Sequence, residues 1–136
     1  MASPISPEPE VHASGLTEAM LEAVVRAFYG AAREDALLGP VFARVTDWEH
    51  HIGRICAFWS SVVLRTGRYS GQPMMVHLDL GLDAAHFGRW MELFERTTTE
   101  LCPPAGAALL MDRARRIGES LLMGIETHRG ILPTRP

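Results

Sequence analysis

Apolar residues recur at helical spacing along almost the whole of this 136-residue chain, and no stretch alternates convincingly as a strand does. Apolar positions every three or four residues are the pattern of amphipathic helices that pack around a core. A chain of this length fits one domain. The sequence therefore predicts an all-α domain of four main helices with short connectors, without a second domain.

N-cap residues and prolines place the ends of these helices. Thr17, Asp47 and Asp83 each precede an apolar-periodic run, and their side chains can accept from free backbone N–H groups. Pro73 suits the first turn of a short helix over residues 74–78, and Gly81 can follow it in a left-handed conformation. The main helices are predicted over residues 17–35, 47–65, 83–102 and 105–128.

The two ends of the chain are expected to be tails around a domain at residues 16–130. Residues 1–15 contain three prolines but no basic start and no apolar run, so they do not form a secretory signal. Residues 131–136 form a short C-terminal tail. Cys56 and Cys102 are predicted to be free thiols in a reducing cytoplasm. No stretch approaches the roughly 18 consecutive apolar residues that a membrane span requires.

The basic residues argue against a nucleic-acid partner. All thirteen are arginines, and the formal net charge is -3. They are spread from Arg26 to Arg135, whereas nucleic-acid binding favours a clustered positive surface. The local group at 113–116 is interpreted as the solvated side of a helix.

Two adjacent histidines in the second predicted helix serve as an internal control. At about 100° per residue, His50 and His51 cannot both face the core. Counted from Trp48, His51 lies at the margin of the apolar stripe and His50 lies in solvent. His51 is then either a core-edge imidazole bonded to a backbone carbonyl or a pocket residue that donates to a ligand or gates its entry.

Three further polar residues leave alternatives open. A buried Tyr29 must satisfy its hydroxyl, through a backbone carbonyl or a ligand. Trp90 is either core or a donor whose indole N–H suits an anionic oxygen species. Arg54 is either a solvated arginine or a partner for an acidic ligand group such as a haem propionate.

His77 lies near the end of the short predicted helix and has two interpretations. It is either a satisfied structural group or a lone imidazole opposite an apolar pocket, which is how a protein holds a haem iron. The sequence lacks the spacing for di-iron, zinc, phosphate-loop or covalent haem sites. Noncovalent haem remains compatible with a lone histidine at an apolar pocket. The other histidines, His12, His86 and His128, are interpreted as structural or exposed.

Taken in order, five motifs resemble those of the truncated haemoglobins, and within them group III. The absence of any Gly-Gly pair, together with His51, distinguishes the chain from groups I and II. The resemblance covers about residues 16–130 and implies a two-over-two helical sandwich around haem. The motifs are Phe28-Tyr29, Leu38-Gly-Pro-Val-Phe42, Trp48-x-x-His51-x-x-x-Ile55-x-x-Phe58-Trp59, Tyr69-x-Gly71-Gln-Pro73-x-x-x-His77 and Phe87-x-x-Trp90-x-x-Leu-Phe94.

The resemblance implies a role for each matching residue. His77 becomes the proximal iron ligand through Nε2, and Phe42 packs on the porphyrin. Tyr29 and Trp90 donate hydrogen bonds to bound oxygen, and His51 gates the distal side. The remaining residues expected at the cofactor are Arg54, Ile55, Tyr69 and Met74.

The function that the resemblance implies is a bacterial, cytoplasmic haem b globin that binds O2, NO, CO or peroxide. Its polar distal site favours redox or detoxification chemistry over bulk transport. The alternative is an enzyme with nitric oxide dioxygenase or peroxidase-like turnover, supported by an unidentified reductase. A haem-independent helical interaction module is a third interpretation. Neither nucleic acid nor membrane is expected as a partner.

Overall fold

The structure, a computed structural model, describes residues 12–78 and 80–130. Residues 1–11 of the N-terminal tail predicted over residues 1–15, and the predicted C-terminal tail at residues 131–136, lie outside this described part. The described part is helical and contains no strand. None of its helices is long and apolar enough to cross a membrane. The elements are α1 (Glu18–Glu34), η1 (Gly39–Phe42), α2 (Trp48–Trp59), η2 (Ser60–Leu64), α3 (Pro73–His77), α4 (Ala84–Leu101) and α5 (Pro104–Arg129).

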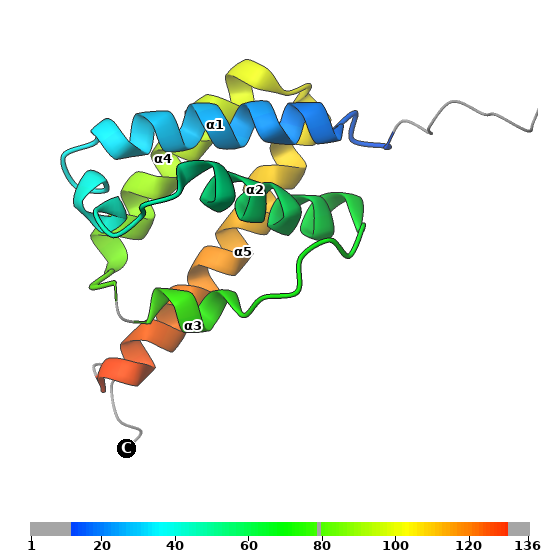
Figure 1. Cartoon of the computed structure of the whole chain (residues 1–136). Coiled ribbons are helices and arrows are strands. Elements are labelled where there is room, and N and C mark those ends of the chain that lie inside the picture. Colours follow the sequence, from blue (N-terminus) through cyan, green and yellow to red (C-terminus); the bar gives the residue numbers. More distant parts are fainter. Residues whose placement is uncertain (1–11, 79, 131–136) are drawn as a thin grey trace, which may run out of the picture.

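The four long helices form two layers of two. Helices α1 and α2 lie in front of α4 and α5 in Figure 1, and α1 packs on both α2 and α4, while α4 packs on α5. The short helix α3 lies against the C-terminal half of α5, away from α1 (Figure 1). This arrangement confirms the predicted all-α fold of two helices over two.

The predicted N-caps are present at three helix starts. Thr17 accepts from the Met20 N–H at 3.1 Å, and Asp47 accepts from the His50 N–H at 3.1 Å. The Asp83 carboxylate accepts hydrogen bonds from the backbone N–H groups of Ala85 and His86 in the first turn of α4. These side chains satisfy backbone donors that have no partner within the helix, which is why short-range sequence signals located the helix starts correctly.

Aromatic residues fill the centre of the fold. The fully buried Phe28 of α1 packs on Trp90 and Phe94 of α4, with ring centroids 4.9 and 5.6 Å apart. Phe94 also stacks on Trp59 of α2 at 5.2 Å. Helical spacing predicts one apolar face on α1, and the structure confirms that its members are buried; they are Leu21, Val24, Val25, Phe28 and Ala32.

Helical spacing over residues 83–102 predicts a core stripe for α4, and this prediction is wrong at its last member; the predicted stripe is Phe87, Trp90, Met91, Phe94, Thr98 and Leu101. Leu101 is 41% exposed, because it is the last residue of α4 and the helix presents a different set of positions to its neighbours. The buried residues of α4 are Leu93, Phe94, Thr97 and Thr98. Thr97 and Thr98 can be buried because each hydroxyl donates to a carbonyl one turn earlier.

The second helix also differs from the prediction of one continuous α-helix. It changes at Ser60 into the π-helical turn η2 and ends at Arg65, whose φ is 60°. The buried Ser60 hydroxyl donates to Glu18 Oε2 at 2.7 Å and lies 2.6 Å from Thr66 Oγ1. This turn therefore joins the end of α2 to the start of α1 through side chains distant in sequence, which helical periodicity does not reveal.

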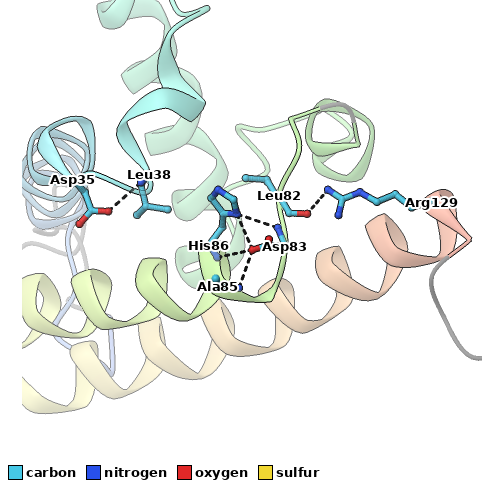
Figure 2. Close-up of polar contacts among 7 residues, drawn as sticks. All are labelled: Asp35, Leu38, Leu82, Asp83, Ala85, His86 and Arg129. Atoms are coloured by element: carbon cyan, nitrogen blue, oxygen red, sulfur yellow. Dashed lines mark hydrogen bonds and ion pairs between the residues drawn. The ribbon is translucent and has the colours of Figure 1, made fainter.

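A carboxylate fixes the end of α1 against α4. Asp35 accepts from the N–H groups of Leu37 and Leu38 at 3.0 Å each, and from Arg89 Nε at 2.7 Å; Figure 2 shows the bond to Leu38. The Arg89 guanidinium, followed by the backbone donors, holds the pKa of Asp35 below its ordinary value. The corner between α1 and η1 is thereby anchored.

We expect Asp35→Asn to lower the melting temperature at pH 7. Because the folded-state pKa of Asp35 is lowered, its contribution is complete above the unfolded value of about 3.9 and is lost as the pH falls through the folded value. The difference between wild type and variant should therefore shrink near pH 3. Thermal unfolding followed by circular dichroism at pH 7 and at pH 3 measures this difference in melting temperature. Asp112→Asn, at ion pairs on α5, is the matched control; an equal shift there would count against the anchor.

Candidate functional site

A cavity of about 380 Å³ lies among the helices. Its lining comes from α1, η1, α2, α3, α4 and α5, and most of it is apolar with a few polar groups, which is typical of sites for cofactors and small ligands. The lining residues with polar atoms in their side chains are Tyr29, Arg44, His51, Arg54, Tyr69, His77, His86 and Trp90.

His77 is the last residue of α3 and reaches the cavity with one nitrogen already engaged. Its Nδ1 lies 2.5 Å from the carbonyl oxygen of Pro73, one turn earlier. A carbonyl only accepts, so Nδ1 carries the proton and donates. The lone pair of Nε2 is then available for a metal, and the Nδ1 bond fixes the orientation of the ring, as is usual for metal-binding histidines.

Tyr29 supplies a protonated hydroxyl among aromatic rings. Its ring lies edge-on to Phe42 at 5.5 Å and to His51 at 6.0 Å. Burial raises the pKa of Tyr29 to about 12, although a hydrogen bond with Trp90 opposes the rise. The Trp90 indole N–H can only donate, and its effect on this pKa indicates that it lies near the phenol oxygen. The Tyr29 hydroxyl therefore stays protonated at neutral pH and can donate a hydrogen bond to a ligand in the cavity.

His51 faces the cavity while His50 is exposed, as the helical period predicts. The His51 ring is half-buried and lies edge-on to Trp48 at 5.3 Å and to Phe42 at 6.4 Å. Burial lowers the pKa of His51, and the neighbouring His50 lowers it slightly more. His51 is therefore a neutral imidazole at neutral pH, able to donate from one nitrogen and accept at the other.

Arginines and a tyrosine form the rim of the cavity. The Arg54 guanidinium lies over the Tyr69 ring, 5.3 Å from its centroid. A Cβ at Gly71 would lie 2.8 Å from Arg54 Nη2 and closer still to the Tyr69 hydroxyl, so a larger residue here would displace the ends of these two side chains. Neither Arg44 nor Arg54 forms an ion pair within residues 12–78 and 80–130. The rim thus presents positive charge to an anionic group.

All predicted site residues except Met74 line this cavity. Phe42 comes from η1 and Ile55 from α2, beside the residues already described. The thioether of Met74 instead packs against α5 at Gly124, where a Cβ would collide with it. The structure therefore places Met74 between α3 and α5, where it sets the distance of the short helix from α5.

The sequence analysis missed several lining residues. Phe87, Ile117 and Leu121 lie on helix faces whose apolar spacing predicts a packed core. Periodicity identifies the inward face of a helix without showing whether a cavity or a neighbouring helix lies beyond it. Phe58 appeared only as part of a motif. Helix register is the signal that could have found two of them, since Phe58 lies two turns after His51 on α2 and Phe87 one turn before Trp90 on α4.

His86 has the predicted structural role and a second one. Its Nδ1 lies 3.1 Å from the Asp83 N–H and 2.9 Å from Asp83 Oδ1, completing a capping box at the start of α4 (Figure 2). The ring also lines the cavity. Just before it, Arg129 at the end of α5 donates to the Leu82 carbonyl, which ties α5 to the corner that follows α3 (Figure 2).

Comparison with known proteins agrees with this geometry. No family model matches the chain. A protein described as group 3 truncated hemoglobin ctb, from Campylobacter jejuni subsp. jejuni, is 32% identical over 96 residues, which are 66% of this chain and 76% of that protein. The crystal structure of a group III truncated hemoglobin from Campylobacter jejuni matches with a TM-score of 0.76 and 28% identity, covering 81% of this chain and 91% of that one. The chain belongs to the group III truncated haemoglobins.

Proposed function

We propose that this globin binds haem b noncovalently in the cavity and binds diatomic ligands on the side of the haem opposite His77. The observation that carries the proposal is His77 itself, with Nδ1 bonded to Pro73 and Nε2 available beside an apolar cavity. The wall formed by α1, α2 and α4 supplies Tyr29, His51 and Trp90. An imidazole nitrogen that is free to bind iron, at a cavity that also holds several hydrogen-bond donors, supports the assignment to a haem globin.

The residues present fit haem better than a bare metal ion. In the described part of the chain, no three or more His, Cys, Asp or Glu side chains are grouped so that they could hold a metal. An iron bound at His77 therefore needs its other ligands from a porphyrin. Apolar residues such as Phe42 and Ile55 suit the faces of the ring, and Arg44 and Arg54 suit its propionates.

Haem supplies the iron that coordinates the diatomic ligand, and the chain supplies the groups that select it. The Tyr29 hydroxyl keeps its proton and donates, and the Trp90 N–H donates to the same region. Such donors stabilise a ligand that carries negative charge on its outer atom more than one that does not. We therefore infer that O2 is held more tightly relative to CO than it would be in an apolar pocket.

The test uses protein reconstituted with haem and reduced. Absorption spectra under nitrogen, O2 and CO should show reversible binding of both gases, with slow release of O2. Protein that takes up haem but oxidises at once in air, without a stable O2-bound spectrum, would rule out O2 as the ligand and leave NO, CO or peroxide.

Turnover is the second candidate function, favoured by the two donors Tyr29 and Trp90 in the cavity. Donors of this kind can polarise O2 or peroxide as well as retain O2. Mixing the O2-bound form with nitric oxide, and the ferric form with peroxide, decides between the two. Repeated turnover with a reductase would establish an enzyme, with redox detoxification as its role; a single reaction per haem would leave a binding protein.

Gly71→Ala should weaken haem binding without unfolding the protein. The new Cβ would push Tyr69 and Arg54 from the rim, since both occupy the space beside the Gly71 backbone. We expect haem affinity to fall about tenfold, in line with the loss of a supporting contact at a metal site. Haem transfer to apomyoglobin measures it. Gly53→Ala, in α2 where a Cβ meets nothing, is the control; equal losses would argue against a role for the rim.

A further inference from the structure

A cation lies directly over the tryptophan at the start of α2. The Arg33 guanidinium, from the last turn of α1, lies 3.9 Å from the centroid of the Trp48 ring. Arg33 is exposed and Trp48 is half-buried against the core, so this stack forms at the surface where the core ends. Attraction between a cation and an indole face is worth about 0.5–1 kcal/mol at exposed sites.

The tryptophan of this stack also contacts His51. Trp48 lies edge-on to His51, with ring centroids 5.3 Å apart and planes at 87°. Trp48 also packs on Phe42 at 5.8 Å, and Phe42 packs on Tyr29 at 5.5 Å. The His51 ring is therefore packed in a cluster with the rings of Trp48, Phe42 and Tyr29.

The base of Arg33 is held in place by the anchored corner. The Gly39 backbone lies so close to the Arg33 carbonyl that a Cβ there would sit 2.8 Å from the oxygen. Asp35, two residues after Arg33, accepts from Arg89 of α4 and so fixes the same turn. The backbone that carries Arg33 is thus fixed by these contacts. Movement of the Trp48 ring away from the guanidinium would break the cation–π contact.

We propose that Arg33 and Trp48 form a latch that holds the His51 ring inside the cavity and so controls how fast ligands reach the haem. This inference rests on the proposed function. Arg33 and Trp48 are positioning residues, because they act through His51 and do not line the cavity. For His51 to swing outward, Trp48 must move first, and Arg33 resists that movement.

The test compares CO association after flash photolysis in haem-loaded, reduced variants. Arg33→Gln should raise the association rate about two- to fivefold, the equivalent of the stack's strength. Trp48→Ala, which also removes the aromatic contacts, should raise it about tenfold or more. Arg33→Lys retains a cation and Trp48→Phe retains an aromatic ring. The CO association rate in each of these variants should therefore be close to that of the wild type. Arg115→Gln, exposed on α5, is the matched control.

A second readout does not depend on ligand binding. In the CO-bound or haem-free protein, NMR contacts from the His51 ring to Tyr29 and Phe42 should weaken in Arg33→Gln and Trp48→Ala but not in Arg115→Gln. Unchanged rates together with unchanged His51 contacts overturn the latch. If wild type takes up no haem, the proposed function fails, yet the NMR contacts still decide whether Arg33 and Trp48 hold His51.

Discussion

Replacing His77 with glycine is expected to remove tight haem binding. His77 offers an imidazole nitrogen that is oriented by a backbone carbonyl and available to the cavity. Losing a group that merely supports a metal ligand costs about 10–100-fold in affinity, so losing the ligand should cost about 100-fold or more. The measurement is the rate at which haem leaves the variant for apomyoglobin.

Added imidazole provides the sharper form of the same experiment. A free imidazole can enter the space left by His77→Gly and should restore the visible spectrum of the ferrous form. His128→Gly, at the exposed end of α5, is the matched control and should keep the wild-type spectrum. If His77→Gly retained haem with an unchanged spectrum, another residue would hold the iron.

Tyr29→Phe is the second substitution with a large expected effect. A hydrogen bond to a partly charged acceptor is worth about 1.5 kcal/mol, so O2 should leave the reduced protein about tenfold faster. Trp90→Phe should act in the same direction. CO carries less charge on its outer atom and serves as the internal control, since its dissociation should change far less. Stopped-flow displacement of O2 by CO gives the rates.

The double variant tests whether these two donors act as a unit. Trp90 lies within hydrogen-bonding reach of the Tyr29 oxygen and affects its pKa, so removing one residue alters what the other can do. We therefore expect the combined effect on O2 dissociation to differ from the sum of the two single effects. Additive effects, or equal changes for O2 and CO, would show that the polar pair does not select the ligand.

Local features of the sequence were sufficient to predict the helices and the orientation of several side chains. Thr17, Asp47 and Asp83 act on backbone groups within their own first turns, so their effect does not depend on the rest of the fold. The opposite environments of His50 and His51 follow from 100° per residue alone. The family motifs added the relative order of these residues along the chain, which periodicity does not supply.

The remaining features depend on contacts between distant segments. The π-helical turn at Ser60 joins α2 to Glu18, forty-two residues earlier. Met74 is directed to α5 because Gly124 leaves a space there. The Arg33–Trp48 stack requires the end of α1 to lie beside the start of α2. None of these contacts leaves a periodic or local signal, so each appears only when the helices are assembled.

Titration of the haem-free protein with ferric haem tests the central claim most directly. The Soret absorbance should rise to saturation at one haem per chain, and the melting temperature should increase with haem concentration, as it does for any ligand that binds the native state alone. A titration without saturation, or a melting temperature that haem leaves unchanged, would contradict the account of a haem site at His77.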